Sequence, residues 1–401
     1  MNSSATTWTP ERKILLACAA AGNDESARAE LCMLVARSPD WNGILTNAES
    51  HGVIPLLRAR LDELCPADAV PAAVRRHLRR ACLSSATQNL RMTGELLNIL
   101  QALEEAGIEA VPFKGPALAS QLFGNVAQRQ FRDLDILVRP GQISAAIEVM
   151  LSRGYLKEFE LTAVREAEYL RSEHALQFHS PSGEFIVEIH WNFGSRYQAF
   201  PLTAAAVWER LRVVSLQGRS IRALSNEDLC IYLCLHGAKH GWDRLEWICS
   251  LAQLMRTQPL DWPLLFRQAV ESGALRALRL GLLLAKQICA VSFPATVASQ
   301  LSADPIAASL ASQVKERLLS SAESQQVPEI RRQAFYIRTR ERLTDRARIL
   351  LLYWFRIPHP HSRDWELFRL PDSLSFLYYL LRPLRLLGNH GLRLLQRQDS
   401  I

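Results

Sequence analysis

The sequence predicts an α+β fold in which a small mixed sheet stands between two helical regions. Apolar residues recur at three- and four-residue spacing before residue 95, alternate along short segments up to about residue 204, and then return to helical spacing. A chain of 401 residues is long enough for two or three units of this kind. We therefore expect an N-terminal helical region at 1–94, an α+β core at 95–204, and a C-terminal helical region with a basic tail at 205–401.

The central region alternates strand and helix signals. A short strand ends at Lys114, and the Gly115-Pro116 pair opens a helix. The segment 133–139 indicates a second strand, and 141–155 indicates an amphipathic helix. "HALQFHS" and "EFIVEIHW" alternate in polarity and are joined by a Pro-Ser-Gly turn, which predicts an antiparallel hairpin.

The composition is that of an ordinary globular protein, with 48 % hydrophobic and 22 % charged residues. The N-terminus lacks a basic start followed by a long apolar core, and no stretch of 18 apolar residues is present. We therefore expect neither a signal peptide nor a transmembrane helix. The eight cysteines form no Cys-x-x-Cys pair, and the spacing of Cys230 and Cys234 is typical of core packing on a helix. These features predict a cytoplasmic protein.

The positive charge is concentrated near the C-terminus. Residues 331–401 hold 14 Arg, no Lys and 6 acidic residues, a net +8 in a chain whose total is +7. Such a region favours an anionic partner. The last apolar segment carries Arg382, Arg385, Arg393 and Arg397. It admits two interpretations: a helix in peripheral contact with an anionic membrane, or a helix packed on the protein with solvated arginines.

Two acidic residues lie within the apolar strand "DLDILV". Asp133 and Asp135 are two apart and share one face, while Leu134, Ile136 and Val138 line the other. Adjacent carboxylates repel each other unless a cation lies between them. The strand therefore predicts a metal site.

A metal site for phosphoryl chemistry needs a further oxygen ligand on the same face of a neighbouring strand. Glu188 is the lone acid among the apolar residues of "FIVEIHW", and His190 shares its face. Three carboxylates suit Mg²⁺, with Mn²⁺ as an alternative cofactor.

Positive groups for phosphate binding surround these acids in the sequence. Lys114 supplies a point charge, and Gly115 allows close approach of the backbone at a helix N-terminus. Arg129 and Arg132 precede the carboxylates and can clamp phosphate oxygens.

A second group lies downstream on a predicted helix, where His236, Lys239 and His240 are close in sequence. One interpretation is that the histidines pack between helices while the lysine is solvated. The other is that Lys239, together with His240, closes on the phosphates. A zinc pair lacks further ligands in the sequence.

In this order, the motifs resemble those of the nucleotidyltransferase superfamily, which has the DNA-polymerase-β-like fold. The chain is most similar to a branch of uncharacterised nucleotidyltransferase proteins, whose pattern includes a Lys-Gly turn, an Arg before Asp-x-Asp, and an acid followed by His-Trp. Here the motifs are "FKGPAL", "RQFRDLDILV" and "VEIHWNF", followed by "LCLHGAKHGWDRLEWICSLAQL". The resemblance spans roughly residues 80–390.

The resemblance implies Mg²⁺-dependent transfer of a nucleotidyl group from an NTP to an acceptor hydroxyl. Asp133, Asp135 and Glu188 would be the catalytic, metal-holding residues, and Glu188 would act as the base. The implied nucleotide-binding residues are Lys114, Gly115, Arg129, Arg132, Lys239 and His240.

The sequence departs from the family pattern at several positions. The Lys114-Gly115 turn stands where the superfamily usually has Gly-Ser, and Phe123 stands where Tyr is common. Glu188 replaces a common Asp, and Ser250 replaces an Asp that often follows "WI". The three acids of the proposed metal site remain.

Two alternatives to nucleotidyl transfer stay open at the level of the sequence. The same site could transfer a phosphoryl group, or the chain could be an inactive helical binding or scaffold protein. A nucleic-acid partner is disfavoured because no basic and aromatic stripe lies near the acids. The acceptor is left as a small molecule, saccharide or peptide, and the resemblance implies a biosynthetic tailoring pathway.

Overall fold

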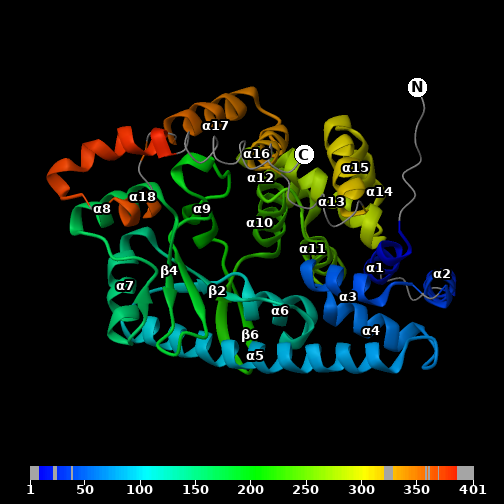
Figure 1. Ribbon diagram of the computed structural model, residues 1–401. Coiled ribbons are helices and arrows are strands. Elements are labelled where there is room, and N and C mark those ends of the chain that lie inside the picture. The colour runs from blue at the N-terminus through cyan, green and yellow to red at the C-terminus, as the bar shows by residue number, and fades with distance from the viewer. Residues whose placement is uncertain are drawn as a thin grey trace, which may run out of the picture.

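The computed structural model confirms the α+β class, with a five-stranded mixed sheet and a two-stranded hairpin among helices (Figure 1). It describes residues 9–20, 25–37, 39–319, 328–356, 359, 362–368 and 370–385.

The larger sheet has the strand order β1-β2-β5-β4-β3. Its only parallel pair, within the described part of the chain, is β2 with β5 at its centre, and the other neighbours are antiparallel. The strands are β1 (Ala110–Pro112), β2 (Asp133–Val138), β3 (Leu156–Lys157), β4 (Ala175–His179) and β5 (Ile186–His190). The predicted strands and the antiparallel hairpin β4–β5 are thus confirmed.

Helices precede, cover and follow this sheet. The N-terminal helices are α1 (Pro10–Ala20), α2 (Glu25–Ala36), α3 (Trp41–Ser50), α4 (Ile54–Leu64) and α5 (Ala72–Glu105). Those among the strands are α6 (Gly115–Phe123), α7 (Ile143–Ser152), α8 (Ala163–Ser172) and α9 (Ala204–Trp208), with short 3₁₀ turns η1 (Val126–Gln128), η2 (Pro140–Gln142) and η3 (Arg196–Gln198).

The C-terminal part is built from further helices. These are α10 (Asn226–Lys239), α11 (Leu245–Thr257), α12 (Trp262–Ser272), α13 (Leu275–Cys289), α14 (Ala295–Ser302), α15 (Pro305–Leu319), α16 (Glu329–Arg338), α17 (Leu343–Arg356), α18 (Ser362–Leu367) and the 3₁₀ segment η5 (Asp372–Leu377). Cys230 and Cys234 are both fully buried on α10, which confirms their predicted packing role.

The two faces of the sheet differ in polarity, as strand alternation requires. Leu134, Ile136 and Val138 are fully buried in a core shared with α5 and α7. Val187 and Ile189 of β5 join the same core. The opposite face carries the acids of β2 and β5, so the structure confirms the predicted division of β2 into an apolar and an acidic face.

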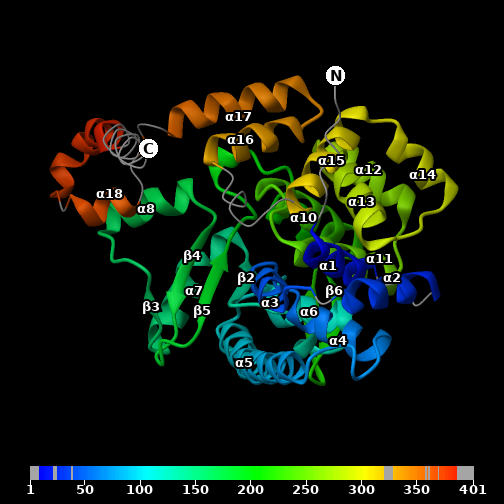
Figure 2. The ribbon, with the colours of Figure 1, turned by 45° about the vertical axis from the view of Figure 1, so that its right-hand side comes forward.

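The helix α5 connects two hydrophobic cores. Its first half, with Val74 and Leu78, packs into a large core that contains residues of α1, α3 and α4 as well as α10 to α15. Its second half, with Leu96 and Leu103, packs beneath the sheet. Figures 1 and 2 show α5 running along one edge of the molecule, below both the sheet and the N-terminal helices. The boundary expected between 94 and 95 therefore falls inside one continuous helix, and the three-part division remains a proposal.

A second, two-stranded sheet follows the main one. It is the hairpin of β6 (Arg212–Leu216) and β7 (Arg219–Ala223), in a region where the sequence analysis expected helices. Its two-residue loop, Gln217-Gly218, has positive φ angles of 51° and 81°. These angles match the twist that tight hairpins need.

The C-terminal arginines divide into two groups. Arg382 and Arg385 bind the buried carboxylate of Asp364, at 2.9 and 2.7 Å. Arg393 and Arg397 lie outside the described residues. Across the described ranges, the structure contains no helix with the length and apolarity to cross a membrane.

Candidate active site

The parallel pairing of β2 with β5 sets Asp135 directly beside Glu188. The two residues are partners in the strand register, and Asp133 lies two residues earlier on the same face of β2. Asp135 is almost fully buried, whereas Asp133 and Glu188 are half-buried at the surface of a cavity. The third acid is thus on the neighbouring strand and on the predicted face.

Two side chains, those of Lys114 and His190, bind the carboxylate of Asp135. Lys114 Nζ lies 2.8 Å from Asp135 Oδ1, and His190 Nε2 lies 3.2 Å from the same oxygen and 3.1 Å from Glu188 Oε2. Burial alone would raise the pKa of Asp135, but Lys114 and His190 outweigh it and the pKa falls. Burial likewise opposes the charged form of Lys114, yet Asp135 raises the pKa of the amine well above its usual value. This cluster therefore keeps Asp135 and Lys114 charged.

The pKa values of the other members of the cluster shift in different directions. Burial, followed by the nearby Asp135 carboxylate, raises the pKa of Asp133 to about 6. Burial would also raise the pKa of Glu188, but the hydrogen bond from His190 reverses the shift and the pKa falls. For His190, the two carboxylates overcome burial and raise the pKa.

The turn at Lys114-Gly115 brings the lysine to the acids. Lys114 is the N-cap of α6 in extended geometry, and Gly115 follows with a φ of +53°. A Cβ at Gly115 would lie 3.1 Å from the carbonyl oxygen of Asp133. The glycine thus permits a close approach of this turn to β2.

Arg129 is held by a residue far away in the sequence. Its Nε lies 2.6 Å from Glu246 Oε1 of α11, and the same oxygen accepts a hydrogen bond of 2.8 Å from Ser250 Oγ. Asn89 of α5 holds the backbone carbonyl of Arg129 at 2.7 Å. One guanidinium nitrogen of Arg129, Nη1, is buried without a hydrogen-bond partner among the described residues. Arg129 is therefore fixed in position with one donor unused.

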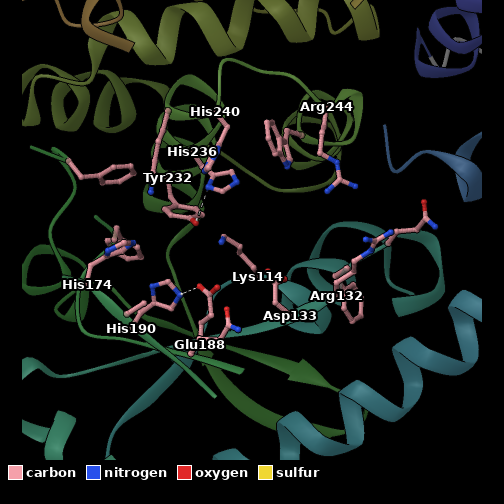
Figure 3. Close-up of a pocket in the computed structure, with 18 of the residues that line it drawn as sticks. Lys114, Arg132, Asp133, His174, Glu188, His190, Tyr232, His236, His240 and Arg244 are labelled. Atoms are coloured by element: carbon pink, nitrogen blue, oxygen red, sulfur yellow. Dashed lines mark hydrogen bonds and ion pairs between the residues drawn. The ribbon is translucent and has the colours of Figure 1, made fainter. Parts of the chain in front are cut away.

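These groups surround a cavity of about 560 Å³ between the sheet and α10 (Figure 3). In Figure 3, Lys114 lies between Glu188 and Asp133 on one side and the rings of Tyr232 and His236 on the other. The cations that line the cavity are Lys114, Arg129, Arg132, Lys239 and Arg244. Positive groups that stand among acids suit a polyanionic ligand that brings its own cation.

Three of the imidazoles that line the cavity are held neutral. Burial lowers the pKa of His174 to about 4 and that of His240 to about 3, and it places the pKa of His236 well below its usual value. The rings of His236 and His240 are 4.7 Å apart, and both contact Trp247. This α10 wall is therefore an uncharged aromatic surface at pH 7.

The carboxylates fit a hard divalent cation. Asp135 Oδ2 is buried without a hydrogen-bond partner among the described residues. A bound cation would satisfy such an oxygen. Potential ligand atoms of Asp135, Glu188 and His190 all lie within 4.8 Å of one another. His190 already hydrogen-bonds both carboxylates through Nε2, so the oxygens of the acids are the suitable ligands for Mg²⁺.

The structure brings together most of the residues singled out from the sequence. Seven of the nine line the cavity, namely Lys114, Arg129, Arg132, Asp133, Glu188, Lys239 and His240. Asp135 lies behind them, in contact with Lys114, and Gly115 is buried at the start of α6. Their roles in binding and catalysis remain predictions.

Sequence reasoning missed several residues of the cavity. Arg244, the N-cap of α11, and His174, the residue before β4, line the cavity, and Glu246 of α11 binds Arg129, which also lines it. Glu246 is a single buried acid on an otherwise apolar helix face, which is a signal that could have marked it. The sequence around His174 offers no comparable signal.

Comparison with solved structures gives low overall similarity. A lincomycin-bound lincosamide antibiotic adenylyltransferase, LnuA, matches at 17 % identity and a TM-score of 0.25, covering 34 % of this chain and 82 % of its own. The antibiotic-resistance factor ANT(2'')-Ia matches at 14 % identity and a TM-score of 0.29, and the match covers 57 % of this chain and 94 % of that protein. An antigenic nucleotidyltransferase-like protein from Paracoccidioides brasiliensis matches at 15 % identity and a TM-score of 0.34, and the match covers 53 % of this chain and 92 % of that protein. No curated protein matches the chain.

The comparison with family models is more decisive. A family described as uncharacterised nucleotidyltransferases matches residues 37–290, which is more than half of the chain and includes the whole sheet, α10 and α11. This chain belongs to that nucleotidyltransferase family.

Proposed function

We propose that this protein transfers a nucleotidyl group from an NTP to a hydroxyl of an acceptor, with Mg²⁺ as cofactor and Mn²⁺ as an alternative. The observation that carries the proposal is the pairing of Asp135 with Glu188 in one strand register, beneath a cavity lined by cations. The unpartnered Oδ2 of Asp135 supports a cation at this point. Membership of the family supports the transferase class.

Asp133, Asp135 and Glu188 would hold the metal. When bound, a divalent cation supplies charge stabilisation for the reacting phosphate and for the attacking and leaving oxygens. His190 positions two of these acids through its Nε2, which lies near both carboxylates. Lys114 keeps one positive charge next to Asp135.

The nucleotide would lie along the cationic side of the cavity. Arg129 offers its unused Nη1 donor to a phosphate oxygen, and Arg132 is exposed at the same side. Lys239 adds a charge from the end of α10, and neutral His240 adds an aromatic face and a hydrogen-bonding nitrogen. These positions assign the triphosphate to the cations and leave the histidine-rich wall to uncharged parts of the ligands.

The reaction joins the acceptor oxygen to the α-phosphorus and breaks the bond between that phosphorus and the oxygen that bridges to the β-phosphate. Pyrophosphate leaves, and the proton of the acceptor hydroxyl passes to Glu188. The lowered pKa of Glu188 keeps its carboxylate free to accept a proton at pH 7. The acceptor is a small molecule, saccharide or peptide, and we assign the reaction to a biosynthetic tailoring pathway.

The test is binding of MgATP and MgGTP by calorimetry, with release of pyrophosphate as a second readout. Wild-type protein should bind nucleotide only when Mg²⁺ is present. Asp135→Asn should weaken binding at least about tenfold, because it removes one of the charges that hold the cation. Asp68→Asn, at an exposed position between α4 and α5, is the matched control and should bind as the wild type does.

The products distinguish the competing reactions. Release of pyrophosphate together with an NMP-modified acceptor supports nucleotidyl transfer. Release of a nucleoside diphosphate together with a phosphorylated acceptor would instead show phosphoryl transfer. If wild type and Asp135→Asn bind nucleotide equally with and without Mg²⁺, or neither binds, the metal site is refuted.

A further inference from the structure

The solvent-facing side of α17 is apolar. Leu343, Leu350, Leu351 and Trp354 are between 47 % and 75 % exposed. Their spacing of seven, eight and eleven residues from Leu343 places them on one stripe of the helix. On a helix at the surface of a soluble domain this stripe would normally be polar, so its composition calls for a partner.

The orientation of this stripe is fixed by contacts on the other side of the helix. Ile349, on the opposite face, is 3 % exposed and belongs to the main core. Just before α17, the fully buried Arg340 bonds Ala199 O at 3.0 Å and the hydroxyl of Tyr336 at 2.7 Å. The helix therefore cannot turn its leucines inward without breaking these contacts.

A second segment also carries exposed apolar side chains. Phe376, Leu380 and Leu384 are each more than 60 % exposed. Figures 1 and 2 show α17 and the chain after α18 along the same upper edge of the protein. We call Leu343, Leu350, Leu351 and Trp354 of α17, together with these three residues, the apolar edge.

The charge around the apolar edge is positive. Arg346 and Arg348 of α17 and Arg342 just before it outnumber the acid in this helix, Asp345, and Arg348 is exposed. Arg342 and Arg346 bond backbone carbonyls, those of Val270 and Arg340, so no carboxylate neutralises them through these bonds. A partner that covers the apolar edge must therefore tolerate or prefer positive charge.

We propose that the apolar edge docks on an anionic lipid bilayer surface. Leucines with Trp and Phe beside arginines are the composition of helices that lie in the plane of a membrane interface. A second copy of this chain is a poorer occupant, because an isologous contact would place the two positive edges against each other. The last apolar segment had two interpretations from its sequence, and because Arg382 and Arg385 are bound to Asp364 we assign the membrane contact mainly to α17.

The test is co-sedimentation of the full chain with lipid vesicles. Wild type should bind vesicles of phosphatidylcholine with about 30 % phosphatidylglycerol and should bind pure phosphatidylcholine much more weakly. Leu351→Ser/Trp354→Ser should reduce binding at least about tenfold, because two large apolar side chains no longer enter the interface. The matched control is Leu83→Ser/Leu90→Ser on α5, which changes two leucines that are 70 % and 55 % exposed.

Further arms separate the membrane from other partners. Arg348→Gln leaves the apolar stripe intact and should weaken binding to anionic vesicles only, with the effect shrinking at high salt. Equal vesicle binding by the wild type and the Leu351→Ser/Trp354→Ser variant, or no binding by either, overturns the proposal. A wild-type dimer in light scattering that the same variant dissolves assigns the edge to a second copy and also overturns it. None of these readouts depends on nucleotide, so the result is independent of the proposed function.

Discussion

Lys114 connects the chemistry of the sheet to the helical wall above it. Its ammonium lies 2.8 Å from Asp135 and also 5.6 and 5.9 Å from the ring centres of Phe113 and Tyr232. A cation over aromatic faces keeps its charge while it loses water. The position of this one side chain therefore depends on residues from β2, α10 and the turn before α6.

That turn is sensitive to any side chain at Gly115. Gly115→Ala should lower the free energy of unfolding by about 2–3 kcal/mol, because it combines a positive φ with crowding against the carbonyl of Asp133. Gly107→Ala is the control: its φ is +71° but nothing lies within 4 Å of the new Cβ, so it should cost only about 1 kcal/mol. Urea unfolding measures both. Equal losses in the two variants would show that the close approach to β2 is unimportant.

At the scale of single residues, local pattern predicts what lies along one strand. Asp133 and Asp135 were assigned to one face because alternation on a strand is a local rule, and Glu188 was found as a lone acid in an apolar run. The partnership of Arg129 with Glu246 joins residues that are 117 positions apart. No local rule specifies such a pair, because it depends on how α11 packs against the loop before β2.

At the scale of elements, the start of α11 is held by a buried histidine. His51, after α3, accepts a hydrogen bond from the backbone of Leu245 through Nδ1, and its carbonyl accepts one from Glu246. Burial lowers the pKa of His51 to about 4, and the charges of Arg12 and Arg244 act in the same direction. The contact between these elements thus requires the neutral imidazole.

This requirement makes stability depend on pH. Between the unfolded pKa of about 6.5 and the folded pKa of about 4, the unfolded chain binds a proton at His51 that the folded chain excludes. The stability contributed by the neutral imidazole is complete above pH 6.5 and is lost as the pH falls toward 4, by about 3 kcal/mol in total. Urea unfolding of the wild type and of His51→Gln at pH 7 and pH 4.5 measures the loss.

The variant should lose less stability than the wild type over this range, because it has no proton to take up at this position. His77→Gln, at an exposed histidine, is the control and should follow the wild type. Parallel pH curves for all three proteins would contradict the role assigned to His51.

Elements with strong periodicity were predictable, whereas the hairpin β6–β7 was not. The strands β2, β4 and β5 follow from alternating polarity, but the hairpin β6–β7 was missed inside a region assigned to helices. Its strands are short and half-exposed, so their alternation is weak, and the Gln-Gly loop was the available signal. Val213 on β6 is apolar but exposed, so the apolar residues of this hairpin do not mark its buried face.

At the scale of the whole molecule, the first described helix, α1, folds together with the distant helix α15. Arg12 of α1 donates a hydrogen bond of 3.1 Å to the carbonyl of Leu318 at the end of α15, and both helices contribute to one core. The periodicity of apolar residues predicts which face of each helix is buried. It does not predict which helix packs against that face, since any of several apolar faces could have covered α1. The continuous helix α5 then joins this core to the sheet.

This arrangement predicts one cooperative unfolding transition. Ile14→Ala, at a fully buried position in α1, should lower the free energy of unfolding by about 3 kcal/mol and shift the melting of the sheet and of the helices alike. Calorimetry and hydrogen exchange report on both parts. Leu83→Ala, at an exposed position on α5, should leave the transition almost unchanged. Two separate transitions, with only one of them shifted by Ile14→Ala, would contradict the prediction.

The bridge from Arg129 to Glu246 has a consequence for how this fold can be rearranged. A segment containing only the sheet and its adjoining helices would leave Glu246, the counter-ion of Arg129, behind on α11. Arg129 would then lose the ion pair that fixes its guanidinium at the wall of the cavity. Recombination or engineering that transplants the sheet must therefore carry α11 with it, so the smallest exchangeable unit of this protein is larger than its sheet.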